Sequence, residues 1–421
     1  MQSKEKSILL VDCQSFYASV EKATHPEYTN MPVAVAADPE RRSGIILAAC
    51  PIAKAYGVST AERLSEAVGK CPGLVVIRPR MQTYISVSLL ITKLYESFTP
   101  LVEPFSIDEQ FLDISGSLAL FGSPVEIAKQ IQNSVMLSTG VWTRAGIGPT
   151  KILAKMATDN FAKKHPDGIF ALSSDNIETT LWPLPIHNMF MVASRMTAHF
   201  MRMGIHTIGD LARLDLPEFK RRMRSRMGRQ SDIKATYYWQ TARGIDPSPV
   251  VQHSVSKPKS ITRGRALRWR DYQTLSDIEP LLLELVIEVC RTSRHHNYHG
   301  STVTVSAGTT NGENSRGFSR QTTLSDPSCL EHHIIAAAHK VFLQHWNGDP
   351  LTHLAVDISK LSDNSVYQLD LFEDLLKHRK LAAVKDAIKD RYGEAAILSA
   401  ASLLKSGQAR ERANKIGGHY K

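Results

Sequence analysis

Apolar and polar positions follow two different periods along the first 170 residues. A short apolar run at 8–11 is followed at once by a helical pattern from 15 to 21, which predicts a buried strand that leads into a helix. Further apolar runs are short enough for strands: 32–37, 45–49, 101–105, 111–114 and 145–147. Two longer stretches repeat at helical spacing: 81–98 and 125–137. Strands flanking helices in this way predict an α/β region that closes near residue 170.

The pattern changes after residue 173. Short helices, turns and many cations between 173 and 244 predict a small helical domain, and the prolines between Asp246 and Pro258 predict a linker. Beyond the linker, a separate α+β domain is predicted from two period-two strands and two helices: 301–307, 353–358, 275–295 and 330–345. A lysine-rich tail ends the chain, and its apolar positions predict a helix up to Gly393.

Composition narrows the class of protein. A chain of 421 residues is too long for one small core, and 43% hydrophobic with 22% charged residues is ordinary for a folded protein. The net charge of +10 favours a polyanionic partner, although a basic enzyme that binds no nucleic acid fits it equally well. Five cysteines without C-x-x-C spacing predict neither a disulfide framework nor a zinc site. The apolar runs are too short for a signal peptide or a membrane span, so we expect a cytoplasmic location.

Carboxylates at strand ends are the first candidates for chemistry. Asp12 follows the first predicted strand, and Asp108 with Glu109 adjoins another. Such carboxylates can meet in space and hold hard divalent cations, and two of these cations can drive phosphoryl transfer. Acids that are merely solvated in turns are the simpler interpretation, and composition alone favours it.

Aromatic and cationic residues surround these positions in the sequence. Phe16 and Tyr17 could wall a pocket for a sugar or base, or simply belong to the core. Lysines that could hold a triphosphate, or that could equally form solvated surface, are Lys54, Lys151, Lys155, Lys163 and Lys164.

Two stretches are typical of proteins that grip nucleic-acid phosphates. Gly204 and Gly209 lie in half of a helix-hairpin-helix pattern, where glycine amides can approach phosphate oxygens. Residues 257–270 carry six cations and no acid, and phosphate contact is their most economical explanation. The cations singled out there are Lys257, Lys259, Arg263 and Arg265.

Four motifs together resemble those of Y-family DNA polymerases of the UmuC/DinB type, most of all the UvrX-like branch of Gram-positive bacteria and their mobile elements. They are VDCQSFYASVE at 11–21, SIDE at 106–109, GPTKILAK at 148–155 and GIDPSPV at 244–250. Their order and separations match that family over nearly the whole chain, so coincidence is a poor explanation.

The resemblance implies an α+β right-hand polymerase. It implies a palm at 1–17 and 80–170, fingers at 18–79, a helix-hairpin-helix-like thumb at 171–245, a linker at 246–258, a little finger at 259–362, and a clamp-binding peptide with a tail at 363–421. The implied activity is DNA-directed DNA polymerase of the translesion type, which uses two Mg²⁺ ions, primer-template DNA and a deoxynucleoside triphosphate.

Individual roles also follow from the resemblance. Asp12, Asp108 and Glu109 match the metal-binding carboxylates, and Cys13 matches the residue whose backbone carbonyl faces the metal. Tyr17, beside Phe16, falls at the steric gate that excludes a ribose 2′-hydroxyl. Lys54 and Lys163 match triphosphate-binding positions. The peptide Gln368, Leu369, Asp370, Leu371 and Phe372 is similar to the pentapeptide that docks on the sliding clamp.

Departures from the family pattern leave some assignments open. Gln14 replaces an acid, Pro51 replaces a tyrosine, and Gln110 is larger than the usual residue and is expected to crowd the site. Lys163 lies one residue farther from Lys155 than is usual, so Lys164 competes with it. The tail could bind an accessory subunit or recombinase filament, or pack on the little finger. Rival functions are a two-metal nuclease or cyclase, and a non-catalytic DNA-binding accessory protein.

Overall fold

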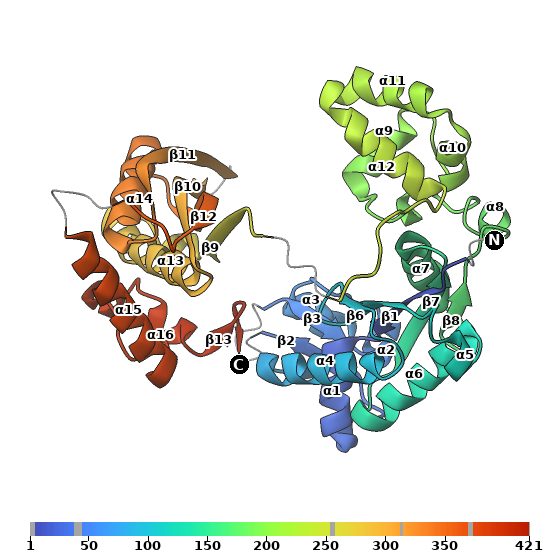
Figure 1. Cartoon of the computed structure of the whole chain (residues 1–421). Helices are drawn as coiled ribbons and strands as arrows, with labels where there is room; N and C mark the ends of the chain where they lie inside the picture. The colour runs from blue at the N-terminus through green and yellow to red at the C-terminus, as the bar shows by residue number, and fades with distance from the viewer. Residues whose placement is uncertain (1–4, 38–43, 253–256, 312–314, 369–373, 421) are drawn as a thin grey trace. The chain divides into compact units, whose positions relative to one another are not determined.

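The computed structural model describes residues 5–37, 44–252, 257–311, 315–368 and 374–420 (Figure 1). The chain divides into two compact units, Met1–Ser254 with His419–Lys421, and Val255–Gly418. In the described residues, no helix is long and apolar enough to cross a membrane.

A five-stranded sheet forms the centre of the first unit. Its strand order is β5-β6-β1-β7-β8. The strands are β1 (Ile8–Cys13), β5 (Val102–Pro104), β6 (Glu109–Asp113), β7 (Thr143–Gly148) and β8 (Ile169–Ala171). Every residue of β1 is buried, as its uninterrupted apolar sequence predicts. The apolar side chains of Leu10 and Phe111 pack against Ala154 of helix α7 on one face of this sheet.

Helices cover both faces of this sheet. Helix α7 (Lys151–Ala157) continues into a π-helical turn, η2 (Thr158–Ala162). On the opposite face, Gln110 of β6 donates a hydrogen bond to Thr92 of α4 (Met81–Glu96), and α4 packs beside α6 (Pro124–Thr139). Gln110 therefore points away from Glu109, and the expectation that its size crowds the carboxylates is wrong.

A small three-stranded sheet lies beside the central sheet, in the order β3-β2-β4. It consists of β2 (Val33–Ala36), β3 (Ile46–Ala49) and β4 (Val75–Ile77). Helices α1 (Phe16–Thr24), η1 (Pro26–Tyr28), α2 (Pro51–Ala55) and α3 (Leu64–Lys70) accompany it.

A helical segment follows, and its buried core also includes Ile152, Leu153 and Met156 of α7. Its helices are α8 (Ile177–Thr180), η3 (Ile186–Asn188), α9 (Ser194–Met201), α10 (Ile208–Arg213), α11 (Leu216–Met227), η4 (Arg229–Ser231) and α12 (Asp232–Ala242). Phe200, Phe219 and Tyr238 fill the centre of this helical core. A short helix α5 (Leu118–Phe121) belongs to the central sheet region instead.

The second unit is built on a four-stranded antiparallel sheet with the order β11-β10-β12-β9. Its strands are β9 (Ser260–Ala266), β10 (Tyr298–Thr310), β11 (Ser315–Ser328) and β12 (Leu351–Asp363). The long helices α13 (Leu275–His295) and α14 (Glu331–His345) pack on one face, where Val303, Val305 and Phe342 are buried.

The tail packs against α13. Its elements in the second unit are α15 (Leu375–Tyr392), η6 (Ala400–Leu403), α16 (Ala409–Arg412) and the short strand β13 (Lys415–Ile416), while β14 (His419–Tyr420) is grouped with the first unit. The Arg294 guanidinium of α13 donates two hydrogen bonds to the Asp386 carboxylate of α15, at 2.6 and 2.9 Å. This geometry favours the interpretation in which the tail packs on its own domain.

Most of the expected elements are confirmed, with shifts of a few residues at their ends. Strand β11 was not expected, because its sequence is polar and almost wholly exposed, without a buried face that would produce a period-two pattern. The peptide from Leu369 to Phe372 lies outside the described residues, and the exact limits of palm, fingers, thumb, linker and little finger stay predictions.

Candidate active site

Sheet pairing brings the predicted carboxylates together. Strands β1 and β6 are antiparallel, and Asp12 lies directly opposite Glu109 in their register. The amide of Cys13, at the end of β1, donates to the carbonyl of Asp108 at 2.9 Å, which keeps Asp108 beside the pair. The Ser106 hydroxyl donates to the Asp108 carboxylate at 2.6 Å and orients it.

A third carboxylate completes the cluster, and the sequence did not single it out. Asp159 comes from the π-helical turn η2, and one carboxylate oxygen from each of Asp12, Glu109 and Asp159 lies within 4.8 Å of the others. The sequence does contain a signal, since Lys155, Asp159 and Lys163 recur every four residues, as on one face of a helix.

Two lysines neutralise this cluster. The Lys163 ammonium lies 2.8 Å from the Asp12 carboxylate, 2.8 Å from Asp159 and 3.7 Å from Glu109. The buried Lys155 ammonium lies 2.7 Å from Glu109 and 3.0 Å from Asp159. Lys151 has another role, because it forms an ion pair with Glu103 at 3.1 Å.

The π-helical turn explains why Lys163 reaches the carboxylates despite the longer spacing. A π-turn accommodates one residue more than an α-turn, so it absorbs the extra residue between Lys155 and Lys163. Lys163 then faces Asp12, whereas the exposed Lys164 makes no ion pair in the described part of the chain. The geometry thus favours Lys163 over Lys164.

Burial and charge shift the ionisation of these groups. Burial and the adjoining Glu109 raise the pKa of Asp12 to about 7, although the Lys163 ammonium opposes that rise. Burial by itself would lower the pKa of Lys163, but the negative charges of Asp12 and Asp159 outweigh it and raise that pKa. Lys163 therefore stays charged beside Asp12, and its positive charge stabilises the ionised form of that buried carboxylate.

This donor set fits a divalent metal. Asp12 is 7% exposed, so its carboxylate needs a nearby cation when it is ionised. Every ligand atom of the cluster is a carboxylate oxygen, which hard cations such as Mg²⁺ and Mn²⁺ prefer. The residues present are thus suited to the metal dependence of the family.

A stacked aromatic pair adjoins the carboxylates. The Tyr17 ring lies on the ring of Tyr84, with centroids 4.4 Å apart and planes 18° apart. The Tyr84 hydroxyl donates to the buried Glu21 carboxylate at 2.6 Å, and Arg80 donates to the same carboxylate at 2.7 Å. The sequence carries no signal for Tyr84 at this site, because nothing along the chain links α4 to α1.

Tyr17 and Phe16 have different surroundings. Burial raises the pKa of the Tyr17 hydroxyl, and the negative charge of Asp108 raises it further, which places this half-buried phenol near the carboxylates. The Phe16 side chain is buried, so it belongs to the core that supports Tyr17. Of the two expectations for this pair, a pocket wall suits Tyr17 and a core position suits Phe16.

Lys54 belongs to α2, and its side chain reaches the start of α1, the helix that carries Tyr17. Its ammonium donates to the Ser15 hydroxyl at 2.9 Å, and Ser15 precedes α1 in a left-handed conformation. Pro51 occupies the first turn of α2, where its missing amide costs no hydrogen bond. Lys54 is exposed, so its ammonium is accessible to a ligand.

The backbone amides of the two glycines predicted to contact phosphate are already hydrogen-bonded within the protein. The Gly204 amide donates to the Met201 carbonyl at 3.0 Å, and the Gly209 amide donates to the Trp182 carbonyl at 2.9 Å. Gly204 has a φ of 74°, which explains the glycine there by backbone conformation.

The four basic residues predicted to contact DNA in 257–270 divide into two pairs. Lys257 and Lys259 are exposed. Arg263 and Arg265 lie on the face of β9 that packs on α13, where Arg265 pairs with Glu288 and only 5% of its side chain is exposed. Arg265 is therefore buried away from solvent.

Comparison with known proteins identifies the family. Residues 11–159 match the impB/mucB/samB family, and residues 258–371 match the C-terminal domain of that family. These are Y-family DNA polymerases, and the chain belongs to that family.

Two relatives from Bacillus subtilis (strain 168) illustrate the similarity. The chain is 51% identical to DNA polymerase IV 2, over 99% of this chain and 100% of the relative. It is 35% identical to the putative UV-damage repair protein UvrX, over 99% of this chain and 98% of the relative. The expected family is confirmed, and the identity to DNA polymerase IV 2 exceeds that to UvrX.

The fold agrees with a solved structure. The Y-family DNA polymerase chimera Dbh-Dpo4(243-245)-Dbh superposes with a TM-score of 0.69, at 22% identity, over 85% of this chain and 100% of the chimera. The expected fold, an α+β right hand with palm, fingers, thumb and little finger, is confirmed.

Replacing Lys163 tests the electrostatics of the cluster. In metal-free protein, Lys163→Ala removes the cation that opposes protonation of Asp12, so we expect the pKa of Asp12 to rise further above its ordinary value. Carboxyl carbon NMR during a pH titration measures this shift. Lys164→Ala is the matched control and should leave the titration unchanged; an equal shift in both variants would refute the specific pairing.

Proposed function

We propose that Asp12, Asp108 and Glu109 form the centre at which this chain, a translesion DNA polymerase by family, transfers a nucleotide from a deoxynucleoside triphosphate to a primer 3′-hydroxyl. The observation that carries the proposal is the register of β1 and β6, which sets Asp12 opposite Glu109 with Asp108 adjoining. Carboxylates fixed on paired strands cannot separate without breaking the sheet, so the cluster is preorganised for cation binding.

Two Mg²⁺ ions are the proposed cofactors. Asp12, Asp108, Glu109 and the backbone carbonyl of Cys13 would hold them. When bound, they supply activation of the primer hydroxyl and neutralisation of the charge that develops on the triphosphate.

The lysines bind the triphosphate in this proposal. Lys163 is tethered by Asp159, so its ammonium can turn from the Asp12 carboxylate to a phosphate oxygen without leaving the site. Lys54 reaches the same region from α2 through its contact with Ser15. The buried Lys155 keeps its ion pair with Glu109, so its proposed role is to position that carboxylate.

Tyr17 sets sugar specificity in this proposal. Its ring is held by the Tyr84 ring, which Glu21 and Arg80 anchor in turn. A ring that cannot retreat presents a hard surface to a ribose 2′-hydroxyl, and a 2′-deoxyribose lacks the clashing oxygen.

DNA contacts are proposed for exposed basic residues. Lys257 and Lys259 are exposed and suit phosphate contact, whereas Arg263 and Arg265 are engaged with Thr292 and Glu288. Because the amides of Gly204 and Gly209 are bonded internally, those glycines would contribute by shaping the turn. Primer-template DNA is thus held by side-chain charge.

The C-terminal segment is proposed to recruit the protein to its partners in the cell. The peptide from Gln368 to Phe372 would dock on the sliding clamp, with Leu371 and Phe372 as the anchors. The tail contacts α13 through Arg294 and Asp386, and an accessory subunit or recombinase filament would have to bind its outer surface. The cytoplasm is the proposed compartment.

Removing the paired acids tests the catalytic assignment. Asp108→Ala with Glu109→Ala should slow primer extension by at least about 10³-fold, because the charge that holds the cations is lost. Gel analysis of a labelled primer measures the rate. Exposed Asp374→Ala is a control that should extend normally. Primer shortening or a cyclic nucleotide would support a nuclease or cyclase instead, and no extension by the wild-type protein with any metal would support an accessory role.

Tyr17→Ala tests the steric gate. Loss of the ring opens space beside the sugar, so the preference for deoxyribonucleotides over ribonucleotides should fall by about 10-fold or more. Single-nucleotide insertion kinetics with both sugars give the ratio of kcat/KM. Tyr56→Ala is a suitable control, since that tyrosine is 59% exposed on α2's end. Unchanged discrimination in Tyr17→Ala would remove its gate role.

The clamp peptide is tested by replacing both anchors. Leu371→Ala with Phe372→Ala should weaken clamp binding by about 2 kcal/mol or more, while extension on naked template stays normal. Titration of clamp into primer-extension reactions measures both effects. Val366→Ala is the control, because Val366 is 78% exposed and precedes the peptide. Equal loss with and without clamp would indicate a structural role.

A further inference from the structure

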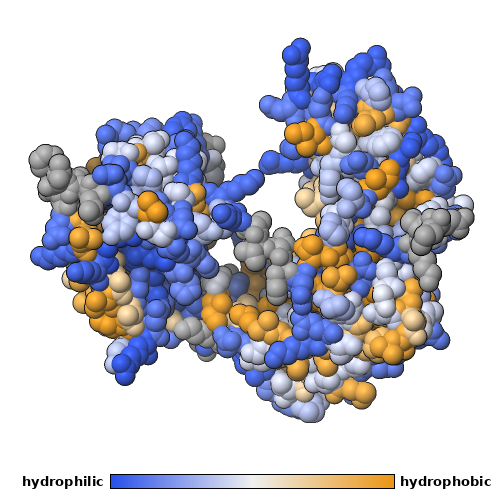
Figure 2. All heavy atoms as spheres, in the orientation of Figure 1, coloured by the Kyte–Doolittle hydropathy of each residue, from blue (hydrophilic) through white to orange (hydrophobic). Residues whose placement is uncertain are grey.

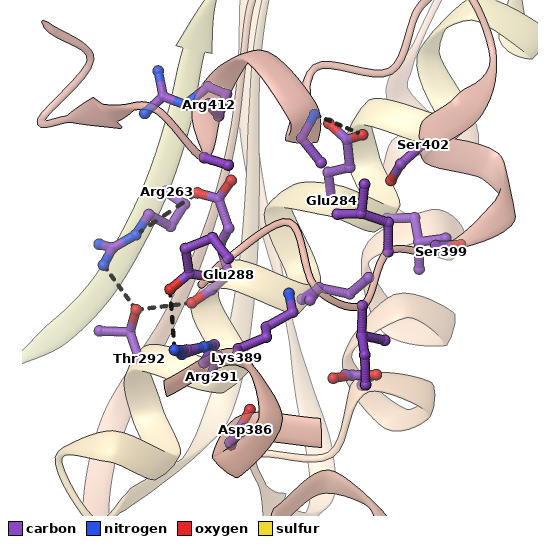
Figure 3. Close-up of a pocket in the computed structure, with 18 of the residues that line it drawn as sticks. Arg263, Glu284, Glu288, Arg291, Thr292, Asp386, Lys389, Ser399, Ser402 and Arg412 are labelled. Atoms are coloured by element: carbon purple, nitrogen blue, oxygen red, sulfur yellow. Dashed lines mark hydrogen bonds and ion pairs between the residues drawn. The ribbon is translucent and has the colours of Figure 1, made fainter. Parts of the chain in front are cut away.

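A cavity of about 950 Å³ lies within the second unit, between the domain and its own tail. Figure 3 shows its walls, with Arg263 from β9, Glu284 and Glu288 from α13, and Lys389 and Arg412 from the tail. None of the residues that line it has a role in the nucleotidyl transfer proposed above. Its volume is in the range of cavities that bind small ligands.

One corner of the cavity holds more cations than its acid can balance. Glu288 pairs with Arg265, and the Nε of Arg263 lies 4.0 Å from the same carboxylate. Arg263 also donates to the Thr292 hydroxyl at 2.7 Å. A single carboxylate is therefore shared by two guanidinium groups.

Arg265 contributes a buried donor that lacks an acceptor. Its side chain is 5% exposed, and its Nε has no hydrogen-bond partner among the described residues. Leaving a buried donor unpaired costs about 1–3 kcal/mol. The Arg265 guanidinium thus has a donor that the Gly264 carbonyl and the Glu288 carboxylate leave unsatisfied.

The tail adds two cations to the same cavity. Arg412 and Lys389 both line it, and neither forms an ion pair within the described ranges of the chain. Burial lowers the pKa of the Arg412 guanidinium, and the positive charge of Arg265 lowers it further. Arg412 thus lines the cavity together with the cations Arg265 and Arg263, and an anion bound there would offset the repulsion between them.

The other acids of the cavity have partners of their own, and Glu331 and Asp386 both pair with Arg294. Arg291 pairs with Asp390 at 2.7 Å and with Glu394 at 3.0 Å. The Glu284 carboxylate accepts the amides of Gln408 and Ala409 at 3.0 and 3.1 Å, and so fixes the start of α16. Within the described ranges, none of these acids forms an ion pair with Arg412 or Lys389.

We propose that this cavity binds a phosphate group, held by Arg265, Arg412 and Lys389. Guanidinium groups donate in the planar fork that phosphate oxygens accept, and Lys389 adds a mobile point charge. The ligand could be a free nucleotide or polyphosphate, or the terminal phosphate of a nucleic acid. Because the contacts come from β9 and from the tail, the ligand would also fasten the tail to the domain.

The test uses the full chain in metal-free buffer and two probes, inorganic pyrophosphate and a 5′-phosphorylated single-stranded oligonucleotide. Calorimetry should show that Arg412→Ala with Lys389→Ala weakens binding by about 10-fold or more, since two charged contacts are lost. The matched control is Arg410→Ala with Lys377→Ala, which removes two exposed cations of the same helices outside the cavity. Arg412→Lys should retain part of the binding, because the charge remains although the planar fork is lost, and this separates lost charge from a misfolded tail.

The probes distinguish the two sources of phosphate. A loss seen with pyrophosphate assigns the site to free phosphorylated ligands, and a loss seen with the oligonucleotide alone assigns it to nucleic acid. In either case phosphate should also protect the bonds after Gly393 from limited proteolysis in the wild type but not in the cavity variant. Equal affinity of wild type and cavity variant for both probes would overturn the proposal.

Discussion

Repulsion between carboxylates on neighbouring strands is the constraint on which the rest of the first unit depends. Pairing of β1 with β6 forces Asp12 and Glu109 together within 4.8 Å, where two such charges repel by about 3 kcal/mol or more at an effective dielectric constant of about 20. The sheet cannot relieve this repulsion by moving, since β1 is buried along its whole length. Cations must therefore be supplied, and the fold supplies lysines from α7 and from the turn after it.

The same constraint explains features that otherwise look unrelated. The π-helical turn brings Asp159 and Lys163 toward the strands, so that Lys163 contacts Asp12 and Glu109 from the strands and Asp159 from the turn. The Tyr17 ring, stacked on Tyr84, closes the adjoining side. The site therefore has carboxylates and a tyrosine ring in fixed positions. Its mobile parts are the ligands and the side chain of Lys163.

The helices and strands could be predicted from the sequence more fully than the side-chain contacts between distant segments. Apolar runs and helical spacing located β1, α4, α6 and α13 within a few residues, because each buries one continuous face. Asp12, Asp108 and Glu109 were found through motifs. Asp159 and Tyr84 were missed, since their importance depends on a π-turn and on packing between α1 and α4. Arg265 looked like a DNA contact by composition, but strand parity turns it toward α13.

The central claim is that a divalent cation replaces Lys163 at the carboxylates. The most direct test is a crystal structure of the protein with Mn²⁺ and a non-hydrolysable deoxynucleoside triphosphate, using anomalous scattering to locate the metal. We expect metal peaks between Asp12, Asp108 and Glu109, with the Lys163 ammonium moved onto phosphate. Metal bound elsewhere, or Lys163 still paired with Asp12 beside a bound nucleotide, would contradict it.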